Sequence, residues 1–519
     1  MTRLDDRLSR LGAPRLLAIR RGIEKESLRA QAGGGLARTP HPAALGSALT
    51  HPHITTDYSE SQLELITGVH AGVQDCLDEL THIHQFVYRS LAEQGDEHLW
   101  VGSMPCGLPP DENIPIGSYG SSNIARAKSV YRMGLGHRYG RRMQTISGIH
   151  YNWSMPGLSN DEHFALIRNF RRHAFLLLTL FGASPAVCTS FVEGREHSLQ
   201  RLSDYTLHQP HATSLRMGRL GYQSDAQATL AVSYNSLDSY AASLHSALTQ
   251  PYAPYEAIGI KNLGGEYNQL ATTLLQIENE FYGTIRPKRV IRPGERPLHA
   301  LRERGVEYIE VRCMDLDPFV PVGIAAPTLR LLDVFLLHCL LQDSPPDTPE
   351  EIAALGRNQH LAAAYGREPG LKLERGGRQV TLVEWADEIL DQCKPLAVAL
   401  DAAHGGAQYG THAAHDSASY SAALAAARQG LADMDSLPSA RVLATMKSDF
   451  NNGYTGFVRA QSAQTRAHLM SLPWASEQQV NFERMAQASL DQRCAIEAAD
   501  QPDFETFRHA YLDPARLMP

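Results

Sequence analysis

Paired carboxylates two residues apart are the first chemically informative feature of the sequence. Glu24 and Glu26 lie in the segment LLAIRRGIEKESLR, in which Leu17, Ile19 and Ile23 are apolar. Successive side chains of a β-strand point to opposite faces of a sheet, so residues two apart share a face. We therefore expect a strand here that presents two carboxylates side by side.

Three further segments show the same alternation of polar and apolar residues, which is typical of a half-buried strand. They are TTDYSESQLELIT from Thr55, QTISGIHYNWSMP from Gln144 and GVEYIEVRCMDLDPF from Gly305. Asp57 stands at the entrance of the first expected strand. The residues expected on the polar faces are Glu60, Gln62 and Glu64, then Gln144, Gly148, His150, Asn152 and Ser154, and finally Tyr308, Glu310 and Arg312.

Any one of these strands could simply face water, because antiparallel sheets commonly have one solvated face. Together, however, they offer many acids with only Arg312 and His150 to compensate, and adjacent like charges are costly unless a cation lies between them. Oxygen ligands, without thiolates or an H-E-x-x-H pair, favour Mg²⁺ or Mn²⁺ over zinc. Mg²⁺ commonly accompanies phosphates, and the Arg312 guanidinium suits a phosphate oxygen pair, so we expect a nucleotide.

The common phosphate-binding motifs are absent from the sequence. It contains neither G-x-x-x-x-G-K-[ST] nor a G-x-G-x-x-G that opens a strand-to-helix unit. The basic run IRPKRVIRPGERP from Ile285 could be an anion site or an exposed charge run. As a whole we predict it to lie at the surface, although its first members, Arg286 and Lys288, could reach a phosphate.

Composition narrows the class of protein. The chain has 519 residues, 43% hydrophobic and 20% charged, which is ordinary for a globular protein. Its net charge of −8 gives no general electrostatic reason to bind nucleic acid or an anionic membrane. The longest apolar stretch, residues 174–187, is shorter than the roughly 20 residues of a membrane helix, and no signal-peptide pattern opens the chain. We expect a cytoplasmic protein.

The seven cysteines are scattered, odd in number and without a C-x-x-C pair. This pattern predicts neither a disulfide framework nor a zinc site.

The chain is expected to have two parts packed as one integrated unit. Residues 1–330 alternate strand-like runs with loops and a few helices, and we predict a catalytic α+β region there. Residues 331–519 are rich in Leu and Ala and predict a mostly helical region packed on the first. Residues 402–421 mix Gly, Ser and other small residues without periodicity and predict a mobile loop.

The same motifs, in the same order over roughly residues 15–330, resemble the proteobacterial type of glutamate-cysteine ligase. They are GIEKESLR, TTDYSESQLELIT, YGSSN, VYRMGLGHRYGRRMQTISGIHYNWSMP, LQIENEFYGTIRPKRV and GVEYIEVRCMDLDPF. The resemblance implies a glutamine synthetase-like fold, with a curved antiparallel sheet around a funnel-shaped site and helices outside. It implies an enzyme that uses ATP to join the γ-carboxylate of L-glutamate to the amine of L-cysteine through a γ-glutamyl phosphate, the first step of glutathione biosynthesis.

The resemblance also assigns roles to individual residues. Glu310 and Arg312 would be catalytic, with Arg312 on the transferred phosphate. Tyr240 and Tyr282 would hold the cysteine carboxylate, while Arg132 and Asn152 are candidates for glutamate. The cysteine side-chain pocket would be lined by Tyr58, Tyr131, Leu135 and Gln144. The Mg²⁺ ligands would be Glu24, Glu26, Asp57, Glu64, His150 and Glu310, a set that leaves out Glu60.

Two alternatives stay open at this point. The site could serve a γ-glutamyl ligase that uses a different amine acceptor, because one superfamily site can take several nucleophiles. The scaffold could also be a catalytically silent sensor of nucleotides or amino acids, although the full set of acids argues against this. Glutathione is a possible feedback inhibitor, because it contains the outlines of both amino-acid substrates.

Overall fold

An open, uncurled antiparallel sheet forms the centre of the structure, a computed structural model that describes residues 3–95, 97–221, 225–228, 230–292, 294–405 and 419–518. Its seven strands follow the order β2-β3-β1-β5-β10-β9, and β4 pairs with β1 beside this path. In chain order the strands are β1 (Arg20–Gln31), β2 (Ile54–Thr56), β3 (Gln62–Ile66), β4 (Glu97–Leu99), β5 (Ile149–Ser154), β9 (Ile285–Lys288) and β10 (Tyr308–Met314).

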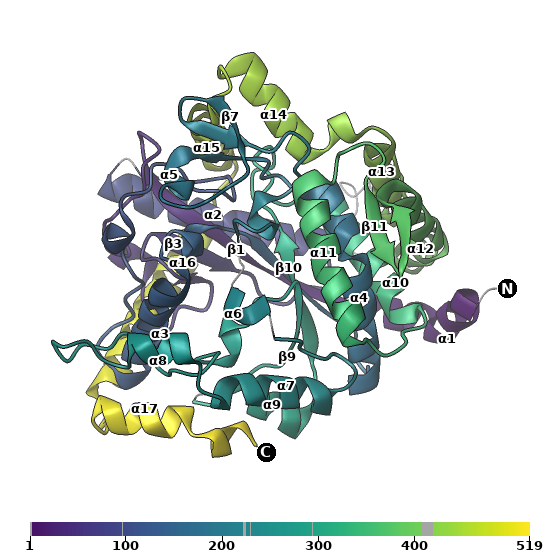
Figure 1. The fold of residues 1–519 in the computed structure, drawn as a ribbon. Coiled ribbons are helices and arrows are strands. Elements are labelled where there is room, and N and C mark those ends of the chain that lie inside the picture. Colours follow the sequence, from purple (N-terminus) through teal and green to yellow (C-terminus); the bar gives the residue numbers. More distant parts are fainter. Residues whose placement is uncertain are drawn as a thin grey trace.

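One face of the sheet is apolar and covered by helices. Ile23 of β1 lies opposite Tyr151 of β5, which lies opposite Val311 of β10, and all three side chains are buried. Helix α2 (Val73–Gln94) packs on β1 and β3, while α4 (Asn160–Phe181) packs on β9 and β10 (Figure 1). Burial of this face fixes the strand register, because a slip of one residue would turn every side chain to the other face.

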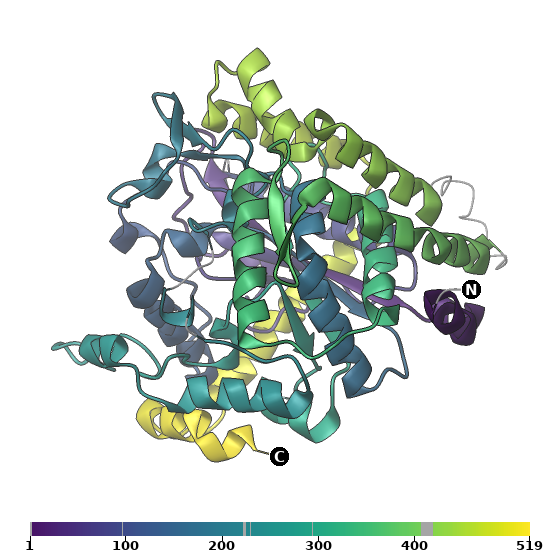
Figure 2. The ribbon, with the colours of Figure 1, turned by 45° about the vertical axis from the view of Figure 1, so that its right-hand side comes forward.

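The C-terminal half of the chain is mostly helical. Helix α10 packs against α4, and α12 and α13 pack against α10; in Figure 2 the blue helix α4 and the green helices after it lie beside the sheet. At the other end of the molecule, α17 packs on α3. These helices are α10 (Ala326–Leu341), α11 (Pro349–Tyr365), α12 (Leu382–Gly405), α13 (Tyr420–Ala432), α14 (Pro438–Asp449), α15 (Tyr454–Ser471), α16 (Ser476–Ala498) and α17 (Phe504–Leu512).

Shorter elements surround the sheet. The additional strands form a three-stranded sheet, β6 (Ala186–Cys188), β7 (Gln200–Ser203) and β8 (Thr206–His208), and a hairpin, β11 (Lys372–Arg375) and β12 (Arg378–Thr381). The remaining helices are α1 (Arg3–Leu17), α3 (Asn123–Tyr139), α5 (Thr189–Val192), α6 (Asp225–Ala228), α7 (Leu237–Thr249), α8 (Ala253–Ile258) and α9 (Pro297–Arg304). Every helix in the described part of the chain is too short or too polar to cross a bilayer.

The α+β class, the antiparallel sheet and the helical C-terminal part are confirmed. The division at residue 330 stays a prediction, and α10 runs across that position from Ala326. The loop expected at residues 402–421 is framed by the end of α12 at Gly405 and the start of α13 at Tyr420, and its residues 406–418 lie outside the described part.

Two sequence predictions about local structure were wrong. Cys106 and Cys188 form a disulfide, with 5.4 Å between their Cα atoms, although the spacing of cysteines predicted none. The two residues are 82 positions apart, so only the tertiary fold brings them together. The segment TTDYSESQLELIT is not a single strand but a hairpin of β2 and β3, in which the Asp57 amide donates to the Gln62 carbonyl.

The apolar face also contains buried polar groups. Lys25 of β1 points to this face, where its Nζ lies 2.9 Å from Ser27 Oγ and 2.8 Å from His84 Nε2 in α2. Its side chain is only 2% exposed, and burial lowers the pKa of Lys25 to about 7. In the core, Lys25 thus hydrogen-bonds to a hydroxyl and an imidazole rather than to a carboxylate.

Because Lys25 is buried, we expect the free energy of unfolding to depend on pH. Its ordinary pKa is 10.5 and the folded value is about 7, so between these values the unfolded chain binds a proton that the folded chain lacks. The free energy of unfolding should therefore rise with pH across that window, by up to about 1.4 kcal/mol per pH unit, relative to Lys25→Met. Urea unfolding of both proteins between pH 7 and 10 measures this difference.

A matched control is Lys372→Met, which removes an exposed lysine of β11 and should show no such trend. If the difference in free energy of unfolding between the wild type and Lys25→Met stayed constant with pH, a neutral, buried Lys25 would be contradicted.

Candidate active site

Cross-strand pairs gather the polar residues on the face of the sheet opposite α2 and α4. Glu26 pairs with Glu64, Glu24 with His150, and Glu310 with Asn152. Residues directly opposite each other on neighbouring strands project to the same side. We call this surface the carboxylate face and define it by Glu24, Glu26, Glu64, His150, Asn152, Glu310 and Arg312.

His150 lies at the centre of the carboxylate face. Its Nδ1 is 3.2 Å from Glu24 Oε2 and 3.9 Å from Glu310 Oε1, and its Nε2 is 3.7 Å from Glu26 Oε1. Glu24, His150 and Glu310 each offer one ligand atom within 4.8 Å of the other two. Three strands therefore contribute to one possible cation site.

Glu26 and Glu64 are buried acids whose ionisation the surrounding protein disfavours. Burial, and then the nearby Asp57, raise the pKa of Glu26 to about 8. Burial, followed by repulsion from Glu24, Asp57 and Glu26, raises the pKa of Glu64 well above its ordinary value. The Gly148 amide donates to Glu26 Oε2 over 2.6 Å, which holds this carboxylate in place.

Glu310 has the opposite electrostatic environment. Lys288 Nζ lies 3.1 Å from Glu310 Oε1, and Arg312 Nη1 donates to Glu310 Oε2 over 3.0 Å. Burial opposes ionisation, but Lys288 and Arg312 prevail and hold the pKa of Glu310 well below its ordinary value. Arg312 is about 20% exposed, so its guanidinium can also reach a ligand.

Asp57 lies in the turn between β2 and β3, close enough to the face to raise the pKa of Glu26 and Glu64. Its carbonyl oxygen accepts hydrogen bonds from Tyr119 Oη and Arg132 Nε. Glu60, in contrast, accepts from the backbone amides of His41 and Ser118, so its carboxylate supports local structure.

The residues assigned to glutamate lie beside the acids. Asn152 Nδ2 donates to Glu24 Oε1 over 2.9 Å, and its Oδ1 is buried without a hydrogen-bond partner among the described residues. Arg132 packs over the Tyr119 ring, and its charge lowers the pKa of Glu64 against the effect of burial. The structure thus places Asn152 on the carboxylate face and Arg132 near its Glu64 end.

The residues assigned to cysteine are divided between two environments. Gln144 Nε2 donates to Tyr282 Oη over 2.8 Å, so these two residues are adjacent. Tyr240 is buried against Tyr234 and Phe164, although Arg286 and Glu310 are near enough to influence the pKa of its hydroxyl. Tyr58, Tyr131 and Leu135 belong to or pack against a second apolar cluster, and the Tyr58 hydroxyl is buried with no hydrogen-bond partner in the described residues.

Further cations adjoin the site, and two of them, Arg286 and Lys288, are the first members of the basic run that were predicted to be able to reach a phosphate. Arg286 of β9 is buried opposite Glu310, and Lys288 pairs with that same carboxylate. The run that was predicted to lie mostly at the surface therefore begins inside the site, and the signal for this is the apolar, polar, apolar, polar alternation of Ile285–Lys288. Arg216 was not identified at all; its Nη2 donates to the Arg312 carbonyl, and a Cβ on Gly148 would lie 1.9 Å from the same nitrogen.

The donor set fits a hard divalent cation. Carboxylate oxygens dominate, burial and neighbouring acids raise the pKa values of Glu26 and Glu64, and the Asn152 oxygen is free to accept. A bound cation would relieve the repulsion between these acids.

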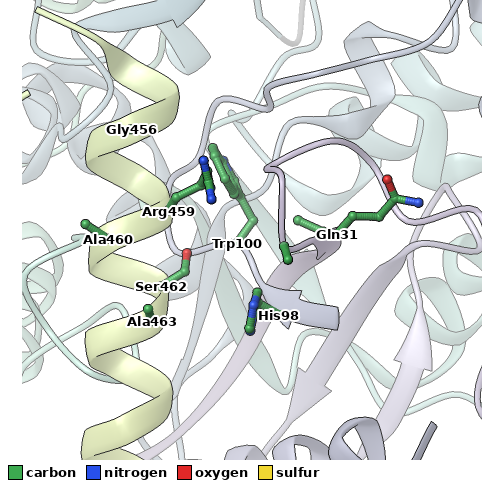
Figure 3. Close-up of a pocket in the computed structure, with 10 residues that line it drawn as sticks. Gln31, His98, Trp100, Gly456, Arg459, Ala460, Ser462 and Ala463 are labelled. Carbon is green, nitrogen blue, oxygen red and sulfur yellow. The ribbon is translucent and has the colours of Figure 1, made fainter. Parts of the chain in front are cut away.

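A separate cavity lies away from these residues. It has a volume of about 390 Å³, is situated between the end of β1, β4 and α15, and is lined by residues that include His98, Trp100, Arg459 and Ser462 (Figure 3). Its ten lining residues include no carboxylate, so the chemistry of the carboxylate face is not located there.

Comparisons with known proteins agree with this geometry. The family model described as glutamate-cysteine ligase matches residues 7–362. A glutamate-cysteine ligase of Alcanivorax borkumensis is 45% identical over 99% of this chain and 100% of its own length, and one of Pseudomonas aeruginosa is 46% identical over 98% and 97%. A crystal structure of the Francisella tularensis enzyme in complex with AMP has a TM-score of 0.88 and 34% identity, covering 96% of this chain and 98% of that one. The chain belongs to the glutamate-cysteine ligase family.

Proposed function

We propose that the protein uses ATP to join the γ-carboxylate of L-glutamate to the amine of L-cysteine on the carboxylate face, the first step of glutathione biosynthesis. The observation that carries the site assignment is the convergence of Glu24, His150 and Glu310 from three adjacent strands. The Francisella tularensis relative binds AMP, which supports a nucleotide site in this chain. A cytoplasmic location belongs to the proposal, because ATP is available there.

The reaction requires activation of the carboxylate. A carboxylate is a poor electrophile, so its oxygen first attacks the γ-phosphorus of ATP, which forms a γ-glutamyl phosphate and releases ADP. The amine nitrogen of cysteine then attacks the acyl carbon, phosphate leaves, and the amine loses a proton. Both phosphate transfer and the approach of two anions need positive charge at the reacting centre.

The carboxylate face supplies groups for both requirements. Glu24, Glu26, Asp57, Glu64, His150 and Glu310 would hold Mg²⁺, or Mn²⁺, which when bound would offset the negative charge of the phosphates. Arg312 would contact the transferred phosphate through its exposed side, while Glu310 holds the guanidinium in place. Arg286 and Lys288 add positive charge beside Glu310 on the carboxylate face.

The amino acids would bind on either side of this centre. Arg132 and Asn152 would hold glutamate beside Glu24. Tyr240 and Tyr282 would hold the cysteine carboxylate, and Tyr58, Tyr131, Leu135 and Gln144 would line the pocket for its thiol. The adjacency of Gln144 and Tyr282 supports a common cysteine pocket.

The direct test is phosphate release from ATP with Mg²⁺, glutamate and cysteine, omitting each component in turn. We expect release only when all four are present, and loss of activity with EDTA that Mg²⁺ or Mn²⁺ restores. Faster release with ammonia or another amino acid than with cysteine would instead indicate a different amine acceptor. Nucleotide binding without phosphate release under any condition would indicate a silent sensor.

Arg312→Met should lower kcat by about 100-fold or more, while changing the KM for cysteine little, because the guanidinium acts on charge that develops during phosphate transfer. Glu310→Gln should also lower kcat strongly. Matched controls are Arg292→Met and Glu307→Gln, which remove exposed charges from the neighbouring segments. Unchanged turnover in the Arg312 or Glu310 variant would contradict these roles.

Glutathione is expected to inhibit the enzyme, because its γ-glutamyl and cysteinyl groups match both substrate outlines. Initial rates with increasing glutathione should fall, and raising glutamate should restore them. Triglycine at equal concentrations controls for a general peptide effect. A rate that is independent of saturating glutathione would exclude this form of feedback.

A further inference from the structure

A second cluster of metal-binding side chains lies in the helical layer, apart from the carboxylate face. His173 of α4 and His338 and Cys339 of α10 each offer a nitrogen or sulfur atom within 4.8 Å of the other two. We call these three residues the α4–α10 cluster. Helix α4 packs on the apolar face of the sheet, so the cluster and the carboxylate face lie on opposite sides of the sheet.

The hydrogen bonds of His338 leave one ring nitrogen available. His338 Nε2 lies 2.9 Å from Gln392 Oε1 of α12, and this amide oxygen also accepts from Gln342 Nε2. A carbonyl oxygen can only accept, so His338 carries its proton on Nε2 and the lone pair on Nδ1. That Nδ1 is buried and has no hydrogen-bond partner in the described part of the chain.

His173 also has a ring nitrogen that lacks a hydrogen-bond partner within the described residues. His173 Nδ1 is also buried without a partner among the residues that the structure describes. The two imidazole rings are 5.5 Å apart between centroids, and the Trp385 ring meets His173 edge-on. Because buried polar atoms are nearly always satisfied, two unsatisfied nitrogens beside a buried thiol point to a missing ligand.

We propose that His173, His338 and Cys339 form a structural Zn²⁺ site that joins α4 to α10. Imidazole nitrogen and thiolate sulfur are the ligands that tetrahedral zinc prefers. The Gln392 amide would act as the outer partner that fixes the metal-binding nitrogen of His338, an arrangement common to histidines that bind metals. On binding, a Zn–S bond forms and the Cys339 thiol releases its proton to solvent.

Cys393 borders the three-residue cluster, and an entry route for a metal ion is present. Cys393 follows Gln392 in α12, is buried, and lies near enough to Cys339 for the two thiols to interact. His173 is partly exposed whereas His338 and Cys339 are buried, so a metal ion would enter past His173. The site would thus connect three helices of the layer that supports the sheet.

Titration of the metal-free protein with Co²⁺, in the absence of reductant and with excess Mg²⁺, tests the proposal. Co²⁺ in this site should give a thiolate-to-cobalt charge-transfer band in the near ultraviolet and the intense visible bands of tetrahedral cobalt. Co²⁺ on the carboxylate face would give no thiolate-to-cobalt band, because that face has no thiol. Added Zn²⁺ should displace the cobalt and abolish both bands.

Variants assign the bands to residues. Cys339→Ser should abolish the charge-transfer band, and His173→Ala should weaken Co²⁺ binding by about 10-fold or more. Cys494→Ser, which removes the exposed free thiol, should leave both bands unchanged. If Cys339→Ser fails to fold, as judged by circular dichroism, Gln392→Leu serves as the second variant and should weaken binding by about 10-fold.

Absence of a thiolate band in the wild type would overturn the proposal. So would a band that persists in folded His173→Ala and Gln392→Leu with unchanged affinity, or one that disappears in Cys494→Ser. Ligase activity is not used as the readout, so a failure here is distinguishable from a failure of the proposed function.

Discussion

The concentration of carboxylates on one half-buried sheet face is the constraint on which the rest of this structure depends. Burial and repulsion from neighbouring acids, Asp57 among them, raise the pKa values of Glu26 and Glu64 at the β1–β3 end. At the β9–β10 end, Lys288 and Arg312 compensate Glu310 and lower its pKa. The face therefore has an acidic end that attracts a metal ion and a basic end that attracts phosphate, and a metal–nucleotide complex could span both.

Much of this face could be predicted from the sequence, because strand periodicity is a local property. In β1, β5 and β10, the two-residue alternation placed Glu24, His150 and Glu310 on polar faces without knowledge of their neighbours. The α+β class followed from the same patterns, together with the Leu- and Ala-rich helices. Which strands adjoin is not a local property, and the order β3-β1-β5-β10 comes only from the structure.

The features that could not be predicted all depend on contacts between distant residues. Lys288 reaches Glu310 only because β9 pairs with β10, and Cys106 meets Cys188 only in the folded chain. Lys25 lies at a position of β1 whose side chains point to the apolar face, yet its Nζ contacts His84 of α2 instead of water. In each case residue type and sequence spacing indicate a surface or unpaired group, whereas the fold provides a specific partner.

The helical layer has a direct role in holding the carboxylate face, through a polar network on the reverse side of the sheet. Asp333 of α10 forms a 2.9 Å ion pair with Arg21 of β1 and accepts a 2.7 Å hydrogen bond from Tyr151 Oη of β5. Both strand residues point to the buried face, and His150 adjoins Tyr151 while Glu24 is three residues beyond Arg21. Loss of one partner from such a buried pair costs about 3–5 kcal/mol, because the other charge stays uncompensated. α10 therefore fixes the relative position of β1 and β5, and with it the contact between Glu24 and His150 on which the site depends.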